Sequence, residues 1–270
     1  MPTKIGLHYN KIGVGKAIYF LHGMGLDGHS MAAFYEPRFT SEERHFSRLY
    51  PDLPGMGTSP ATSALQSADD VLAQVHAFIQ ATSEGPCYLV GHSYGGYLAL
   101  GLLARFPTEF SGAFLTAPVV LAEKTARTVA PLKHLISAPV TSQSPEFTDY
   151  QHMNVVINPS TWRQYQELIL PGLKTFNRDF WVSMKNRHAY RLSIESRLSS
   201  LIKSPVTLVL GENDNEVGYQ DQVVFAHKGA HMTTTVIPNA GHNLMIDAPE
   251  AVMTAFHQFL HKWCQTATLD

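Results

Sequence analysis

The sequence predicts an α/β protein with a mostly parallel central sheet and helices on both faces. Short apolar runs alternate along the chain with stretches of helical length, and this alternation is typical of a parallel sheet whose strands are joined by helices. The chain has 270 residues and 44% hydrophobic content, which is enough to bury the core of one domain with an insertion.

Six short apolar runs predict the buried strands, and four longer stretches predict the helices between them. The expected strands are residues 17–21, 46–50, 87–90, 112–116, 206–210 and 233–237. The expected helices are residues 68–80, 94–105, 219–227 and 249–263, and the second of these should stop near Pro107.

One long segment interrupts this alternation. Residues 119–200 contain prolines, aromatic side chains and helical stretches such as 160–169, but no clear strand. We therefore expect a mainly helical cap at residues 119–200, inserted into a core formed by residues 1–118 and 201–270.

The inserted segment also differs in charge from the rest of the chain. Residues 119–204 carry eleven Lys or Arg against six Asp or Glu, although the whole chain has a formal charge of −2. We interpret its arginines mainly as solvated surface; the alternative is that one of them binds an anionic substrate group. The arginines in question are Arg127, Arg163, Arg178, Arg187 and Arg191.

The composition and net charge indicate which kind of molecule the protein binds. A charge of −2 and a pI near 6.7 give no global reason to expect nucleic acid or a membrane surface, so we expect a small-molecule partner and leave the oligomeric state open. No apolar run approaches the roughly 18 residues of a membrane span, and residues 1–6 lack the apolar stretch of a signal peptide. A cytoplasmic protein is expected. Cys87 and Cys264 indicate neither a disulfide framework nor a metal site.

A serine bracketed by glycines follows the third expected strand. Residues 91–95 read Gly-His-Ser-Tyr-Gly, a G-x-S-x-G pattern at a strand-to-helix turn. A tight turn can hold a serine hydroxyl beside a base, and small flanking residues permit that turn. The pattern alone arises by chance in about one chain in ten of this length, so partner residues must decide its meaning.

Loops after two other expected strands supply such partners. Asp214 follows strand 206–210, and His242 follows strand 233–237. The carboxyl ends of parallel strands are where ligands bind, and Ser93, Asp214 and His242 stand in the chain order of the nucleophile-elbow hydrolases. A histidine of ordinary pKa near 6.5 can accept the serine proton near neutral pH, and an aspartate can fix its tautomer.

With these residues in place, the chain resembles the α/β-hydrolase fold superfamily over nearly its full length. The resemblance implies Ser93 as nucleophile, His242 as base and Asp214 as orienting acid. It also implies an oxyanion hole formed by the backbone N–H groups of Met24 and Tyr94. Besides the serine turn, the matching segments are residues 22–25, 52–59, 211–214 and 241–242.

Several neighbours compete for these roles. Glu212 and Glu216 are the alternative acids beside Asp214. We expect His92 to be a packed structural residue and His22 to brace the oxyanion loop by hydrogen bonds. Asp52 is expected to organise its own Pro/Gly-rich loop.

Two further patterns point to cofactors or metals, and we expect neither. Residues 23–28 form a literal G-x-G-x-x-G with Asp52 as a possible ribose ligand, but a dinucleotide site would leave the placement of Ser93, Asp214 and His242 unexplained. The pairs His227/His231 and His257/His261 have a spacing that could bind zinc. The first pair contains Gly229, and the second has Gln258 where a zincin needs glutamate.

The expected function is hydrolysis of a small carboxylic ester through an acyl-enzyme on Ser93. We expect a mostly apolar substrate site. Its predicted lining residues are Gly23, Gly25, Phe180, Trp181, Met184 and Leu244. The alternatives are a carbon–carbon bond hydrolase or lyase that uses the same three residues on a carboxylate-bearing substrate, and a small-molecule receptor.

Overall fold

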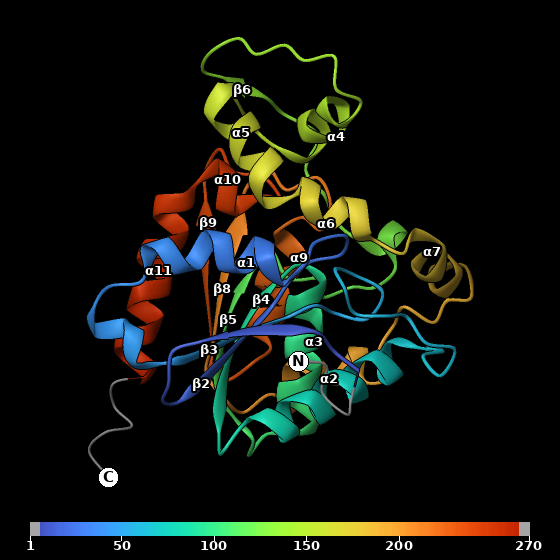
Figure 1. The fold of residues 1–270 in the computed structure, drawn as a ribbon, viewed down its shortest axis with the longest axis vertical. Helices are drawn as coiled ribbons and strands as arrows, with labels where there is room; N and C mark the ends of the chain where they lie inside the picture. The colour runs from blue at the N-terminus through green and yellow to red at the C-terminus, as the bar shows by residue number, and fades with distance from the viewer. Residues whose placement is uncertain (1–5, 265–270) are drawn as a thin grey trace.

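Seven strands form one central sheet, as predicted mostly parallel. The computed structural model describes residues 6–264, so residues 1–5, considered above for a signal peptide, lie outside the described residues. The strands are β1 (Tyr9–Ile12), β2 (Ala17–Leu21), β3 (Ser47–Pro51), β4 (Cys87–His92), β5 (Phe110–Thr116), β8 (Val206–Gly211) and β9 (Met232–Ile237). Their order is β1-β3-β2-β4-β5-β8-β9 (Figure 1), and β1 pairs antiparallel with β3.

All six predicted strands are present, whereas β1 was not predicted. Its sequence is Tyr-Asn-Lys-Ile, and its side chains are only half-buried or exposed. The strand lies at the edge of the sheet, where one neighbour is enough to hold it. An edge strand of this kind has no apolar run by which the sequence could reveal it.

Helices cover both faces of the sheet. They are α1 (Gly28–Tyr35), α2 (Ala68–Thr82), α3 (Tyr94–Arg105), α9 (Gln220–His227) and α11 (Pro249–Phe259). Helices α1 and α11 share one face, where the rings of Tyr35 and Phe256 lie 4.9 Å apart, while α2 and α3 pack together on the other (Figure 1). The four predicted helices are confirmed, with the last ending at Phe259 and continuing as the π-helical turn η5 (Leu260–Cys264).

The segment between β5 and β8 is mainly helical. It contains α4 (Glu146–Met153), α5 (Pro159–Leu168), α6 (Leu170–Thr175), α7 (Arg178–Asn186) and α8 (Leu198–Leu201). The expected helix at 160–169 is confirmed as α5. The expectation that this segment contains no strand is wrong, because β6 (Leu135–Ile136) pairs with β7 (Val156–Ile157). Two-residue strands are too short to show a sequence pattern.

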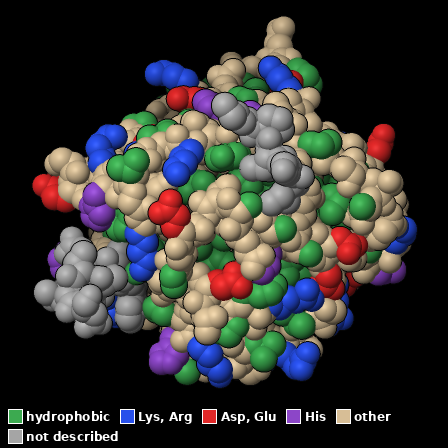
Figure 2. Space-filling view, turned by 60° about the horizontal axis from the view of Figure 1, so that its bottom comes forward, with side chains coloured by type: hydrophobic (Ala, Val, Ile, Leu, Met, Phe, Trp, Pro, Cys, Tyr) green, Lys and Arg blue, Asp and Glu red, His purple; other side chains and the backbone are tan. Residues whose placement is uncertain are grey.

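Short turns of helix complete the described chain. They are η1 (Glu36–Arg38), η2 (Glu42–His45), η3 (Lys124–Ala126), η4 (Glu195–Arg197) and α10 (Leu244–Asp247). No helix within residues 6–264 has both the length and the hydrophobicity needed to cross a bilayer. On the face shown in Figure 2, positive and negative side chains are interspersed.

The inserted segment packs against a loop at the carboxyl end of β3. Trp181 of α7 donates its indole N–H to the carbonyl oxygen of Pro54 at 3.2 Å. Nearby, the backbone N–H of Asn177 donates to Gly55 O at 2.9 Å. The segment therefore stands over loops that follow the strands, with β6, α4 and α5 at the top of Figure 1. The division into a core and a cap at residues 119–200 stays a prediction.

Candidate active site

Ser93 occupies a strained turn between β4 and α3. Its backbone has φ of 52° and ψ of −113°, a region that residues with a side chain rarely adopt. Neighbouring backbone groups hold it there, because Ser93 N–H donates to Thr116 O at 3.0 Å and Ser93 O accepts from Val119 N–H at 3.1 Å. The turn is thus tied to the end of the adjacent strand β5.

The glycines around Ser93 are required by close backbone contacts. A Cβ on Gly95 would lie 2.0 Å from Leu21 O and 2.5 Å from His22 O. A Cβ on Gly91 would lie 2.7 Å from the Cα of Gly96. Glycine is therefore the residue that allows α3 to start this close to the ends of β2 and β4.

The structure brings Ser93, His242 and Asp214 into one hydrogen-bonded row. His242 Nε2 lies 2.9 Å from Ser93 Oγ, and His242 Nδ1 lies 2.8 Å from Asp214 Oδ2. All three residues are buried. Because an ionised carboxylate can only accept, His242 carries its proton on Nδ1, which leaves Nε2 to accept from the serine hydroxyl.

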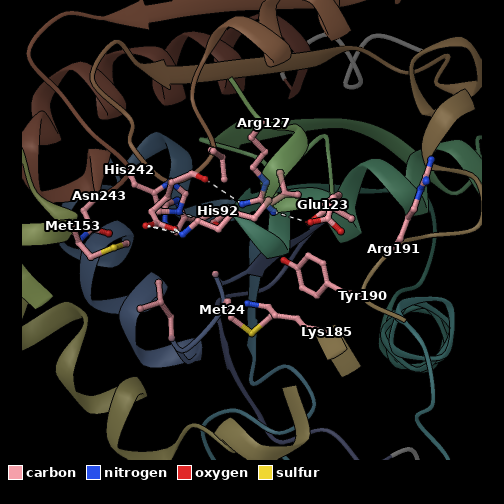
Figure 3. A pocket seen from close by; sticks show the side chains of 18 of the residues that line it. Met24, His92, Glu123, Arg127, Met153, Lys185, Tyr190, Arg191, His242 and Asn243 are labelled. Carbon is pink, nitrogen blue, oxygen red and sulfur yellow. Dashed lines mark hydrogen bonds and ion pairs between the residues drawn. The ribbon is translucent and has the colours of Figure 1, made fainter. Parts of the chain in front are cut away.

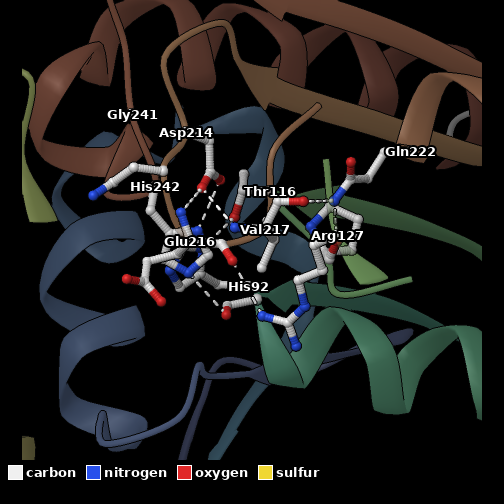
Figure 4. A network of polar contacts seen from close by, with 12 residues as sticks. His92, Thr116, Arg127, Asp214, Glu216, Val217, Gln222, Gly241 and His242 are labelled. Atoms are coloured by element: carbon white, nitrogen blue, oxygen red, sulfur yellow. Dashed lines mark hydrogen bonds and ion pairs between the residues drawn. The ribbon is translucent and has the colours of Figure 1, made fainter. Parts of the chain in front are cut away.

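Asp214 is held in place on its other side by backbone donors. Its Oδ1 accepts from the N–H groups of Glu216 and Val217, each at 2.8 Å (Figure 4). Burial alone would raise the pKa of Asp214, but His242 and these N–H donors outweigh burial and lower it. The carboxylate therefore stays ionised beside the imidazole.

The pKa of His242 shifts in the opposite direction to that of Asp214. Burial alone would lower its pKa, but the carboxylate of Asp214, with a further contribution from Glu216, raises the pKa above the ordinary value of 6.5. The imidazolium that forms when His242 accepts a proton is therefore stabilised by its surroundings.

The competing acids have other partners. Glu212 is exposed. The Glu216 carboxylate lies 3.1 Å from Lys124 Nζ and 3.2 Å from His152 Nε2. Among the three acids considered from the sequence, Asp214 is the one whose carboxylate contacts His242.

His92 and His22 have structural contacts, as expected. His92 Nδ1 lies 3.1 Å from Thr116 Oγ1, and burial, with His242 nearby, lowers the pKa of His92 to about 3. His22 Nε2 accepts from Leu53 N–H at 2.9 Å, so its Nδ1 carries the proton and donates to Gly23 O at 2.8 Å. The neutral His22 ring thereby links the loop after β2 to the loop after β3.

The glycine-rich segment 23–28 is tied to Asp52. Asp52 Oδ1 accepts from Gly28 N–H at 2.8 Å, and its Oδ2 accepts from Thr58 N–H at 2.9 Å. The Asp52 carboxylate therefore organises its own loop and the start of α1. Within residues 6–264, no three His, Cys, Asp or Glu side chains are grouped to hold a metal ion.

Met24 and Tyr94 lie at two places suited to an oxyanion hole. Tyr94 is the first residue of α3, so its N–H is not used by the helix and sits at the positive end of the helix dipole. Met24 follows β2 and lines the cavity beside Ser93 (Figure 3). The oxyanion hole at Met24 and Tyr94 stays a prediction.

The Ser93 side chain opens into a cavity of about 860 Å³, within the range of sites for small molecules. Gly23, Met24, Ser93 and His242 line it. Apolar residues on its wall that sequence reasoning missed include Val119, Met153, Ile169 and Leu173. They come from separate loops and helices, so no local pattern marks them.

Five residues expected to line the substrate site do not line this cavity, and they are Gly25, Phe180, Trp181, Met184 and Leu244. Met184 and Leu244 are fully buried in the core. Trp181 packs edge-on against the Tyr94 ring, with centroids 5.0 Å apart. Phe180 lines a separate, shallower hollow, and Gly25 N–H points to the sulfur of Met56. The aromatic residues of α7 therefore serve to pack this helix and do not line the substrate cavity.

A buried polar cluster fastens the His242 loop to the inserted segment. Asp247 accepts from Gly241 N–H at 2.8 Å and from Val156 N–H at 2.9 Å. Asn243 donates its side-chain amide to Asn154 Oδ1 at 3.0 Å. The position of His242 therefore depends on residues outside the α/β sheet, and Asn243 itself lines the cavity.

The comparisons with known proteins agree with this fold. The profile described as "Alpha/beta hydrolase family" matches residues 18–255, and the chain belongs to that family. An α/β superfamily hydrolase from Oenococcus oeni is similar over 98% of both chains, with 34% identity and a TM-score of 0.92.

Two other similarities are more distant. The (E)-2-((N-methylformamido)methylene)succinate hydrolase of Acinetobacter baylyi is 25% identical, covering 96% of this chain and 94% of its own. A structure described as a putative aryl esterase from Burkholderia cenocepacia matches 96% of this chain and 95% of its own, at 17% identity and a TM-score of 0.74. The last likeness concerns the fold alone.

The contact geometry around Gly95 predicts the effect of a small substitution. Gly95→Ala should lower the free energy of unfolding by about 2–3 kcal/mol, because the new methyl group would overlap two backbone carbonyls that cannot move without distorting β2. Gly85→Ala is the matched control, since a Cβ there has nothing within 4 Å. Its effect should stay within about 0.5 kcal/mol. Urea unfolding of both variants measures the difference, and equal midpoints would refute the packing argument.

Proposed function

We propose that the protein is a serine hydrolase that cleaves a small carboxylic ester. The observation that carries this proposal is the row of hydrogen bonds from Ser93 through His242 to Asp214, at the wall of a cavity of about 860 Å³. Such a row places a nucleophile, a base and an orienting acid where a small substrate can reach them.

In the first half of the reaction, Ser93 Oγ attacks the ester carbonyl while His242 Nε2 takes the hydroxyl proton. Asp214 keeps the ring oriented and stabilises the imidazolium. The same Nε2 then gives the proton to the departing alcohol oxygen, and the acyl group remains on Ser93. The 2.9 Å separation of Oγ and Nε2 supports direct proton transfer.

Charge on the attacked oxygen needs donors that are already in place. We assign this role to the backbone N–H groups of Met24 and Tyr94, which follow β2 and begin α3. One such donor contributes roughly 10²- to 10³-fold in rate. The hydrogen bonds of His22 to both neighbouring loops support this assignment, because they hold the Met24 loop in position.

The second half of the reaction releases the acid. A water molecule attacks the acyl carbonyl while His242 accepts its proton, and the proton then returns to Ser93 Oγ as the ester bond to the enzyme breaks. Every proton gained by His242 in one half is returned in the same half, so the enzyme is regenerated with the net consumption of one water.

A second candidate is hydrolysis of a carbon–carbon bond in a carboxylate-bearing substrate. Basic side chains on the cavity wall favour it, and the Acinetobacter baylyi relative is named as a hydrolase of a substituted succinate. A parallel screen of esters and diketo acids with the wild-type protein would separate the two reactions.

We also propose that the protein is located in the cytoplasm.

Replacement of Ser93 should remove the activity. Ser93→Ala is expected to reduce kcat for 4-nitrophenyl butyrate by at least about 10³-fold, whereas Ser196→Ala, an exposed serine elsewhere, should retain wild-type turnover. A fluorophosphonate should label Ser93, as located by peptide mass spectrometry. Substantial activity in a folded Ser93→Ala protein, or labelling at another serine, would refute the proposed nucleophile.

The rate should fall on acidification, because only neutral His242 can accept the serine proton. The pKa of His242 is raised above 6.5, so the acid limb of kcat/KM should have its midpoint above pH 6.5. Glu216→Gln removes a negative charge that favours the imidazolium, and the limb should therefore move to lower pH. Stopped-flow or plate assays from pH 5 to 9 measure it; a limb that moves upward would contradict the electrostatics.

A further inference from the structure

We propose that the cavity holds an anion subsite, formed mainly by Lys185 and Arg127, that selects ester substrates bearing a free carboxylate. This inference rests on the proposed ester hydrolysis and specifies its substrate class. In Figure 3, His242 and Asn243 lie on one side of the cavity and Lys185, Tyr190 and Arg191 on the other, with Arg127 beside His92 between them and Glu123 next to Arg127. A substrate could therefore present its ester at one side and its charge at the other.

Within the described part of the chain, Lys185 is the cation on the cavity wall that has no hydrogen bond or ion pair to the protein. Lys124 and Arg191 pair with carboxylates, and Arg127 binds backbone carbonyls. It stands in the last turn of α7, lines the cavity and extends inward in Figure 3. Its recorded partner is the Tyr190 ring, whose centroid lies 5.4 Å from Nζ. Among residues 6–264, no carboxylate lies within ion-pair distance of this ammonium group. Lys185 is exposed to solvent, so its ammonium group can pair with an anion that enters the cavity.

Arg127 adds a fixed positive charge to the same region. Its guanidinium donates to three backbone carbonyl oxygens, those of Leu121 at 2.8 Å, Ala122 at 3.1 Å and Glu216 at 3.1 Å. These bonds set its position but leave its charge without a carboxylate partner. Partial desolvation lowers the pKa of Lys185, Arg127 and Lys124 lower it further, and Glu216 opposes the shift.

The acidic side chains on the cavity wall are engaged elsewhere. Glu216 pairs with Lys124 and His152, and the Asp149 carboxylate accepts from the Tyr165 hydroxyl. Glu123 accepts from the Thr125 hydroxyl at 3.1 Å. Arg191 has its own acid, Glu195, at 3.0 Å. Among the four Lys and Arg side chains on the cavity wall, Lys124 and Arg191 have a carboxylate within ion-pair distance, whereas Lys185 and Arg127 have none among the described residues.

The cavity wall combines these two cations, Lys185 and Arg127, with apolar side chains. The rest of the cavity wall includes Met24, Val119, Ile169 and Leu173, which suit the carbon chain of a ligand. A carboxylate joined by a short apolar chain to an ester therefore matches both parts of the cavity.

Matched half-esters and diesters test the subsite. Monoethyl and diethyl succinate, glutarate and adipate differ in one charge, and chromatography of the released acids gives kcat/KM per ester group. At low ionic strength the best half-ester should exceed its diester by at least about 10-fold. Lys185→Met should reduce this ratio by about 10-fold or more, and Lys185→Arg should largely preserve it. Lys133→Met, an exposed lysine outside the cavity, should not change the ratio.

A binding measurement separates failure of this subsite from failure of the proposed reaction. Calorimetric titration of the Ser93→Ala protein should show monoethyl adipate binding at least about 10-fold more tightly than diethyl adipate, with the preference lost in Ser93→Ala/Lys185→Met. If no ester is hydrolysed but this preference is present, the subsite stands and ester hydrolysis is refuted. Equal binding of the two compounds, or a specificity ratio unaffected by Lys185→Met, would overturn the subsite.

Discussion

The backbone of Ser93, at a φ of 52° between β4 and α3, is the constraint on which the rest of the site depends. This conformation costs free energy of order 1–3 kcal/mol, and contacts on three sides sustain it. Thr116 and Val119 bond to the Ser93 backbone, and Gly95 lets α3 approach β2. The turn lifts the hydroxyl out of the sheet to a point where His242, from a distant part of the chain, can reach it.

The parts of this arrangement that could be predicted are those with a local or repeated pattern. Short runs predicted six strands, of which β9 proved mostly half-buried or exposed rather than buried, and the loops after three of the six contained Ser93, Asp214 and His242. Parallel strands bring such loops together, so their 2.8–2.9 Å contacts follow from topology. Asp214 was preferred over Glu216 from the sequence, and the structure supplies the physical reason, since Glu216 is paired with Lys124.

The parts that could not be predicted depend on how remote segments pack. The α7 aromatics were expected at the substrate, but Trp181 instead anchors α7 to the loop at Pro54. Lys185, one turn further along the same helix, faces the cavity. Trp181 and Lys185 share a face of α7 because they are four residues apart, so the position of the helix along its axis decides which of them meets the cavity, and the hydrophobic pattern of nine residues does not determine that position. The sequence shows the excess of positive charge in the inserted segment. Only the three-dimensional structure shows that Arg127 and Lys185 of that segment line the cavity.

If the strained turn presents Ser93 as the nucleophile, Ser93 must carry the acyl chain during turnover. Rapid-quench mass spectrometry during turnover of 4-nitrophenyl butyrate can detect this adduct, with the reaction stopped by acid within the first turnovers. We expect a butyryl adduct on the peptide that contains Ser93, together with an initial release of up to one equivalent of 4-nitrophenolate. Sustained turnover with no adduct on any peptide, or with the adduct on another residue, would contradict this role of Ser93.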